Sequence, residues 1–188
     1  TAAAVSAVTG RLRPVGALAT ASAALMGPAV ASYTGALVSD TAIPAWHDAH
    51  REMPYLFSAS GVVAASGAAL LATPVRELGP ARRAAMLGAL ADVGAATLIE
   101  RRLGATAAPY KEGVGGKYLH AARALTLGGA LGASTLGRRS RAVSIISGAA
   151  LLAGAWCTKM GVFEAGRASA KDPRFTVQPQ RERLDAAG

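Results

Sequence analysis

The chain has 188 residues, of which 52% are hydrophobic and 16% are charged, whereas about a quarter of the residues in soluble domains are charged. Its formal net charge of +9 would suit a nucleic-acid-binding protein, but the Lys and Arg residues fall between apolar segments, where loops face anionic lipid headgroups. This composition predicts a membrane protein and argues against a soluble domain and against a nucleic-acid partner.

Several apolar segments are long enough to cross a membrane, because roughly 20 helical residues span a hydrocarbon core of ~30 Å. In chain order they lie at about residues 15–39, 54–75, 82–102, 118–137 and 141–160. The first two carry no charge, the third has an acid at its middle, and the fifth is flanked by Arg141 and Lys159, which can snorkel. The predicted fold class is all-α, a multi-pass transmembrane helical bundle of about five spanning helices over residues 1–163.

Both ends of the chain depart from the pattern of spanning helices. Residues 1–8 are apolar without a basic leader, so they are predicted to end an earlier helix of a longer protein, of which this chain is the C-terminal portion. Residues 164–188 mix charges and prolines without an apolar period, which predicts an extended basic tail. More of the Lys and Arg residues lie on the side of this tail, so the tail is predicted to be cytoplasmic, with the bundle in the cell membrane.

Two helices contain residues that predict local distortions or contacts. Pro28 cannot donate to the carbonyl of Ala24 and should kink the first helix, which either borders a cavity or improves packing. Gly128 and Gly132 are four residues apart, a spacing that permits close approach of two helices.

The densest polar group follows the first helix and includes Tyr33, Asp40, His47 and His50. Tyr33 and Asp40 are seven residues apart, so they share one helix face and lie ~10.5 Å apart along its axis. A small polar headgroup could bind beside them. Alternatively, Tyr33 packs against a helix or belongs to an aromatic belt, and Trp46 with Tyr55 marks the membrane interface.

Asp92 is an acid at the middle of an apolar segment, where a charge is costly unless it is protonated, paired or hydrated. We expect a proton relay or a quinone-linked acid, and the alternative is a structural pair with an Arg of an adjacent helix. Glu100 lies eight residues further on, where it continues a polar track to the surface or pairs with Arg101 or Arg102.

No intrinsic metal or haem is expected. Two His residues three apart, His47 and His50, are a weak metal signal, and haem b would need two His facing each other within helices. The single cysteine, Cys157, is too few for an iron–sulfur cluster, so any such cluster belongs to a partner. Nucleotide, zinc-protease and serine-hydrolase motifs are absent from the sequence, and no catalytic residue is predicted.

Several short motifs resemble the NrfD family, the multi-pass membrane subunits of polysulfide-reductase-type molybdopterin oxidoreductases. The motifs are Tyr33-Thr34-Gly35 with Leu37 and Ser39, Pro44-Ala45-Trp46-His47, Met53-Pro54-Tyr55-Leu56-Phe57 with Ser60, and the closing GVFEAGRASAKDPRFTVQPQRER, which looks like the tails of actinobacterial members. Two features depart from the family: His47 replaces the usual Asn after Trp, and five spans are fewer than the family's usual number of about eight.

The resemblance implies a membrane anchor that holds no cofactor of its own. Such a subunit exchanges electrons between the quinone pool, menaquinone or ubiquinone, and a ferredoxin-like iron–sulfur subunit, while a molybdopterin catalytic subunit performs the substrate chemistry. By the same resemblance Tyr33 faces the quinone. A redox quinone also needs hydrogen-bond partners for both oxygens and a nearby acid or base, so Asp40, His47 and His50 complete the predicted quinone-binding residues. Asp92 and Glu100 would form the proton path, and proton translocation could accompany the reaction.

Two other functions are compatible with the sequence. A transporter or channel subunit would use the kinked helix and Asp92 to bind a substrate or an ion near the middle of the membrane. A purely structural anchor would dock soluble subunits through its loops and its basic tail.

Overall fold

Helices account for nearly all of the chain that the structure describes. The computed structural model describes residues 13–175 and residue 177, and within these residues it contains no β-strand. The long helices of this part are α2 (Arg13–Ser39), α4 (Met53–Ala72), α5 (Gly79–Leu103), α7 (Gly113–Ser134) and α8 (Arg141–Lys171). The predicted all-α fold class is therefore confirmed.

Short helical turns connect the long helices. They are α3 (Pro44–Asp48), η1 (Val75–Glu77), η2 (Gly104–Ala107), α6 (Ala108–Lys111) and η3 (Leu136–Arg138), and a further turn, η4 (Pro173–Phe175), follows α8. Proline stands in the first turn of α3, α4, α5 and α6, where its missing N–H breaks no helical hydrogen bond. Gly104 and Gly113 have φ angles of 55° and 63°, so the chain can turn after α5 and again at the start of α7.

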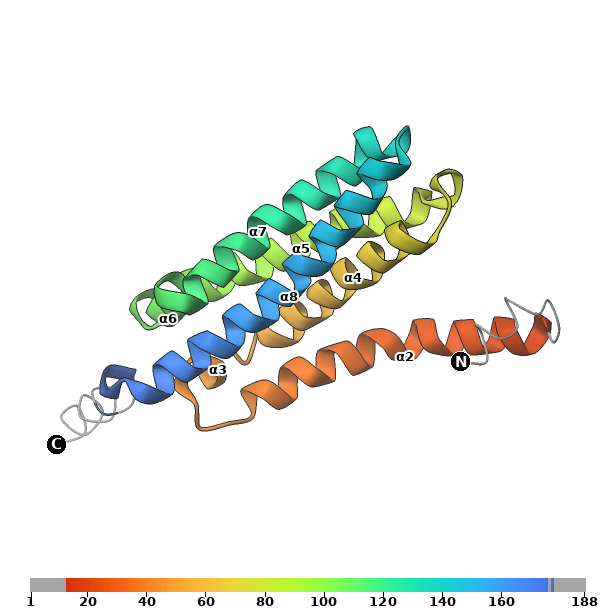
Figure 1. Ribbon diagram of the computed structural model, residues 1–188. Coiled ribbons are helices and arrows are strands. Elements are labelled where there is room, and N and C mark those ends of the chain that lie inside the picture. The colour runs from red at the N-terminus through yellow and green to blue at the C-terminus, as the bar shows by residue number, and fades with distance from the viewer. Residues whose placement is uncertain (1–12, 176, 178–188) are drawn as a thin grey trace.

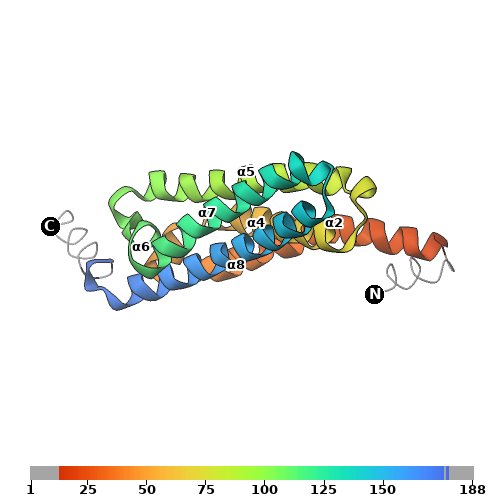
Figure 2. The same cartoon turned by 45° about the horizontal axis from the view of Figure 1, so that its top comes forward.

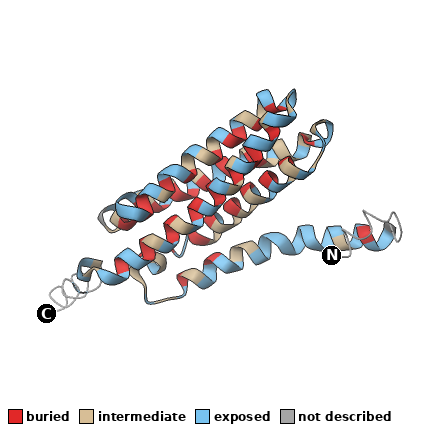
Figure 3. Cartoon of the chain, in the orientation of Figure 1, coloured by how far each residue is buried: buried red, intermediate tan, exposed pale blue. Residues whose placement is uncertain are grey.

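Helices α4, α5, α7 and α8 pack side by side in a bundle, and α2 lies along its edge (Figure 1 and Figure 2). Helix α2 approaches the start of α4 closely at Gly35, where a Cβ would lie 2.6 Å from the carbonyl oxygen of Met53. The rest of α2 is mostly exposed (Figure 3), and its Leu18 and Leu25 are 70% and 73% exposed. An apolar helix with this exposure fits contact with lipid better than contact with water.

Within the described residues, three helices are long and apolar enough to cross a membrane. They are Pro14–Ser39, Met53–Ala72 and Arg141–Lys171. Helices α5 and α7, with 25 and 22 residues, are also long enough but carry charged residues along their lengths. The three apolar helices indicate a protein that associates with a membrane.

Small residues set the distance between α4 and α8. A Cβ on Gly67 would lie 2.8 Å from the carbonyl oxygen of Gly148, and a Cβ on Gly148 would lie 2.8 Å from that of Gly67. Two helix backbones can approach this closely only where no side chain stands between them, as in the small-residue contacts of membrane helices.

Helices α7 and α8 also meet at small residues, but not at the predicted pair. Gly129 and Gly132 lie against Ser147 of α8, whereas a Cβ on Gly128 would meet no described atom within 4 Å. The prediction was therefore wrong for Gly128, because the rotation of α7 turns this residue to the outer surface.

Gly67→Ala is expected to lower the free energy of unfolding by about 1–3 kcal/mol, because the added methyl group would push α4 away from the Gly148 backbone. Gly128→Ala is the matched control, since its new Cβ has open space and alanine is the better helix former. Thermal unfolding in detergent, followed by circular dichroism, measures both variants. Equal melting temperatures for the two variants would contradict the close contact of α4 with α8.

Helix α8 is longer than predicted. The predicted helix ends at about residue 160 and the extended tail begins at residue 164, but α8 continues to Lys171. Its last turns pack against α3 and α6, with Ala165 and Ser169 fully buried. The prediction of an extended tail is thus wrong for residues 164–171, while residues 178–188 and the predicted earlier helix at residues 1–8 lie outside the described residues.

Other helix ends also differ from the predicted ones. Helix α4 ends at Ala72 rather than at residue 75, and α7 runs from Gly113 to Ser134 rather than from 118 to 137. Thr73 and Pro74 leave the helical conformation, because a residue before proline is disfavoured in the α region. Helix α2 continues through Pro28.

Candidate functional site

A carboxylate lies inside the bundle at the middle of α5. Asp92 is 2% exposed, and Thr158 of α8 donates a hydrogen bond from Oγ1 to Asp92 Oδ2 at 3.2 Å. The other oxygen, Oδ1, is buried and has no hydrogen-bond partner among the described residues. Because an unsatisfied buried oxygen is costly, this carboxyl group is the candidate for binding a proton or a polar ligand.

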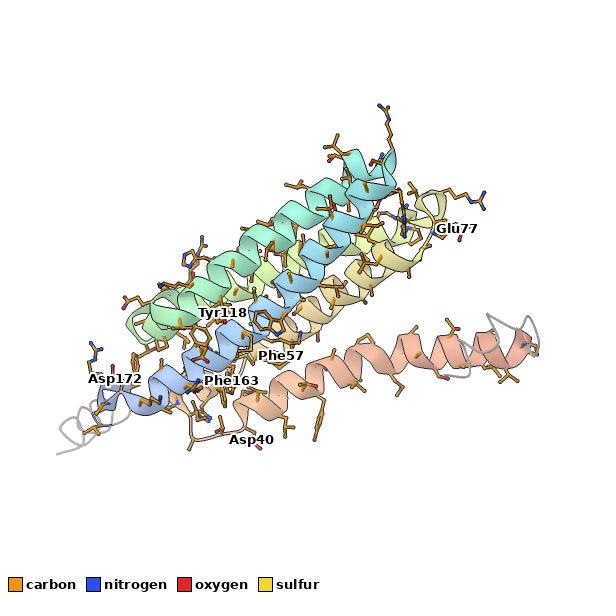
Figure 4. All side chains as sticks on the ribbon, in the orientation of Figure 1. Asp40, Phe57, Glu77, Tyr118, Phe163 and Asp172 are labelled. Carbon is orange, nitrogen blue, oxygen red and sulfur yellow. The ribbon has the colours of Figure 1, made fainter. Side chains whose placement is uncertain are left out.

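Lys159 and Ser60 extend this polar region towards α4. Lys159 Nζ donates a hydrogen bond to Ser60 Oγ at 2.9 Å, and Ser60 Oγ donates to the carbonyl oxygen of Ala155 at 3.3 Å. The ammonium group also lies 5.9 Å from the centre of the Phe57 ring, which Figure 4 shows close to α8. These partners hold a positive charge that interacts electrostatically with Asp92.

Arg123 of α7 is the ion-pair partner of Glu100 and a neighbouring charge for Asp92, to which it forms no hydrogen bond among the described residues. Its Nη2 forms an ion pair with Glu100 Oε1, and its charge also acts on Asp92. The side chains of Arg123 and Glu100 are only 25% and 15% exposed, so the ion pair is largely buried in the bundle. We call Asp92, Arg123 and Glu100 the polar track, which leads from the middle of α5 towards its C-terminal end.

Near the C-terminal end of α5, a second ion pair joins this helix to the turn between α3 and α4. Arg102 donates from Nε and Nη2 to the two carboxylate oxygens of Glu52, each at 2.6 Å. The same Nη2 donates to the carbonyl oxygen of Asp48. Arg102 is therefore not the partner of Glu100, and it fixes the end of α5 to the start of α4.

Helix α3 is held against α6 and α8 by two aromatic residues. Trp46 Nε1 donates to the carbonyl oxygen of Val162 at 2.7 Å, and the Tyr110 hydroxyl donates to that of Ala45 at 2.7 Å. Burial, together with the nearby negative charge of Asp48, raises the pKa of Tyr110, so its hydroxyl remains a donor. These bonds position α3, which carries His47, and the turn after it, which carries His50.

The predicted quinone-binding residues lie at this same end of the molecule and on its surface. Tyr33 is 64% exposed on α2, and Asp40, His47 and His50 are also exposed. The rings of His47 and His50 are adjacent, with centroids 5.9 Å apart. Figure 4 shows Asp40 where α2 ends, and no hydrogen bond of the described structure joins Tyr33 or Asp40 to the two histidines.

Sequence reasoning missed several residues around Asp92. It did not identify Ser60, Arg123 or Thr158 as site residues, and it placed Lys159 at the end of the fifth helix with its amine reaching the surface. In the structure α8 continues past Lys159, whose amine binds Ser60 instead. One signal was available: small residues recur every four positions, at 161, 165 and 169, and so continue the helical period beyond Lys159.

The alternative partner predicted for Asp92, an Arg of an adjacent helix, is found in part. Arg123 interacts with Asp92 through its charge, but the direct hydrogen bond comes from Thr158. Among the described residues, no three His, Cys, Asp or Glu side chains come together as a metal site requires.

Searches against protein-family models, curated proteins and solved structures found no match to this chain. The function is therefore inferred from the site and from the sequence motifs.

Proposed function

We propose that this chain is the membrane anchor subunit of a molybdopterin and iron–sulfur oxidoreductase complex and that it exchanges electrons with the quinone pool. The observation that supports this function most directly is the buried Asp92, with one satisfied and one unsatisfied carboxylate oxygen, at the inner end of the polar track. Acids inside membrane helices are rare and usually serve proton or ion movement.

In this proposal all five long helices cross the cell membrane, and the end of α8 faces the cytoplasm. The charges of α5 and α7 agree with such crossing, because Asp92 is buried and Arg123 pairs with Glu100 inside the bundle. Paired and inward-facing charges cost far less in a bilayer than charges that face lipid.

The NrfD-like motifs support the same function because they meet in space. Gly35, the last residue of the Tyr33-Thr34-Gly35 motif, lies against the backbone of Met53 and Pro54, which open the Met53-Pro54-Tyr55-Leu56-Phe57 motif. The candidate quinone residues and the outer end of the polar track thus share one end of the molecule. A proton released at the quinone would enter the track at Glu100.

Quinol oxidation releases two electrons and two protons, and quinone reduction consumes them. Tyr33 would hydrogen-bond a quinone oxygen from the exposed face of α2, and Asp40, His47 or His50 would serve the second oxygen or its proton. The electrons pass to or from a partner's iron–sulfur cluster, since Cys157 alone cannot ligate one. Glu100 and Asp92 would carry the protons.

Purification of the tagged full-length protein from its own cells tests the proposed assembly. Molybdenum and iron should co-purify with the chain, and the purified complex should oxidise or reduce a soluble quinone analogue. Isolation of the chain alone, combined with substrate uptake by vesicles that contain it, would contradict the proposal and favour a transporter that uses Asp92.

Tyr33→Phe is expected to lower quinone-linked turnover by about three- to tenfold, mainly through a higher KM, because one hydrogen bond to the quinone is lost. Tyr55→Phe is the matched control, since Tyr55 is 73% exposed on α4 and belongs to no proposed site. Steady-state assays of the purified complex measure both variants. If Tyr33→Phe gives the same KM and turnover as the control, Tyr33 does not bind the quinone. If an Asp92 variant also leaves turnover unchanged, the results favour a structural anchor.

A further inference from the structure

A basic pocket lies at the end of the bundle opposite α3 and α6. At this end α4 and α7 finish, α5 and α8 begin, and η1 and η3 connect them, as Figure 1 shows. The pocket has a volume of about 490 Å³ and lies between α5 and the end of α7. It is lined by Gly79, Arg82, Arg83, Met86, Ser134 and Arg138.

Arg82 is fixed in the wall of this pocket. Its Nη2 donates hydrogen bonds to the carbonyl oxygens of Val75 at 3.1 Å and Gly137 at 2.9 Å, so it joins η1 to η3. Its Nε is buried and has no hydrogen-bond partner among the described residues. Carbonyl groups satisfy part of this guanidinium group, but they do not neutralise its charge.

The positive charge of the pocket is not balanced by acids. In the described structure, no carboxylate forms an ion pair with Arg82, Arg83 or Arg138, and the latter two are exposed. The nearest acid of this end in the sequence, Glu77, forms an ion pair with Arg76 at 3.6 Å. Three guanidinium groups therefore share one pocket without a counter-ion from the residues that the structure describes.

The surroundings of the pocket favour an anion further. Helix α5 begins at Gly79, and the N-terminus of a 25-residue helix carries partial positive charge. Ser134 adds a hydroxyl group to the lining. Arg141 is not available to the pocket, because its Nη1 donates to the carbonyl oxygens of Leu70 at 3.0 Å and Thr73 at 2.7 Å.

The position of the pocket indicates the source of its ligand. Helices α4 and α8 are two of the three that are long and apolar enough to cross a membrane, and the pocket lies at the end of the bundle where α4 ends and α8 begins. When these helices cross the bilayer, the three arginines lie at the level of the lipid headgroups. Arginine binds phosphate oxygens through two parallel N–H donors, and basic pockets between membrane helices bind anionic headgroups.

We propose that this pocket binds an anionic phosphate group, held by Arg83 and Arg138 and supported by the fixed Arg82. The group is either the headgroup phosphate of an anionic phospholipid or free inorganic phosphate at the membrane surface. This site lies at the opposite end of the bundle from the candidate quinone residues and does not depend on their function.

Lipid binding to the purified full-length chain in neutral detergent tests the proposal. Native mass spectrometry compares phosphatidylglycerol with phosphatidylcholine, and the chain should bind the anionic lipid about tenfold more tightly. Arg83→Gln combined with Arg138→Gln should reduce this preference to less than about twofold. Arg101→Gln combined with Lys111→Gln is the matched control, because it removes two exposed charges from the other end of the bundle and should keep the preference.

A second arm distinguishes the two sources of phosphate. Inorganic phosphate is titrated into the lipid-free chain and into the chain with phosphatidylglycerol. Retention of the lipid at millimolar phosphate identifies the headgroup as the ligand, whereas its displacement, with saturable phosphate binding that the arginine variant loses, identifies free phosphate. Absence of any preference for the anionic lipid together with no phosphate binding would overturn the proposal, and so would equal effects of the two double variants.

Discussion

Asp92→Asn is expected to lower quinone-linked turnover of the assembled complex by about a hundredfold, because an amide of nearly the same size cannot take up and release a proton. The hydrogen bond from Thr158 can persist, since an Asn side-chain oxygen still accepts it at the position of Oδ2. The KM for the quinone should change little, because Asp92 is buried and the proposed quinone residues are exposed elsewhere. Single-turnover and steady-state assays of the complex measure both quantities.

Unfolding measurements separate a functional acid from a structural one at this position. An uncharged Asn removes the cost of an unsatisfied buried carboxylate, so the free energy of unfolding should stay equal or rise while turnover falls. Asp172→Asn is the control for the substitution itself, because Asp172 pairs with Arg174 beyond the end of α8. A loss of about 2 kcal/mol in Asp92→Asn, in parallel with lost turnover, would assign Asp92 a structural role and contradict the proposed proton path.

The all-α fold could be predicted because the main signal is local. Residues 15–39 and 54–75 carry no charge, and a charge-free stretch of this length favours a membrane helix whatever its neighbours are. Asp92 could be identified as a site candidate for the same reason, since one acid among apolar residues is visible in the sequence alone. Both features depend on composition over a single helix, and neither requires knowledge of how helices pack.

Partners across helices could not be predicted in this way. Thr158 and Lys159 reach Asp92 and Ser60 only through the rotation of α8 against α4 and α5, which depends on contacts such as that of Gly67 with Gly148. A sequence read without this packing therefore assigns Lys159 to a helix end.

The end of α8 illustrates a second limit. Charged residues follow Phe163, and a rule based on charge alone ends the helix there. The small residues on the opposite face stabilise the last turns of the helix, because they pack against α3 and α6 and bury Ala165 and Ser169. On these turns the charged residues lie on one face of the helix and the small, buried residues lie on the other. Composition averaged around the helix therefore does not detect the buried face.

Arg123→Gln should be the most destabilising single change in the polar track, at about 3 kcal/mol, because it leaves Glu100 largely buried without its ion-pair partner. Removing one member of a buried ion pair lowers the free energy of unfolding by more than the intact pair contributes, since the remaining charge keeps its desolvation cost. Arg101→Gln is the control, because Arg101 is exposed on the neighbouring helix, and its loss should change the free energy of unfolding by less than about 0.5 kcal/mol.

The double variant Glu100→Gln with Arg123→Gln should recover most of the lost stability, because two neutral amides remain and no unpaired charge is left. Denaturation of the four proteins in detergent completes the mutant cycle and yields the coupling energy between the two side chains. A coupling near zero would mean that the pair contributes nothing inside the bundle. Recovered stability without recovered turnover would instead show that Glu100 and Arg123 are needed for the proton path as well as for packing, because neutral amides restore the fold but not the transfer of charge.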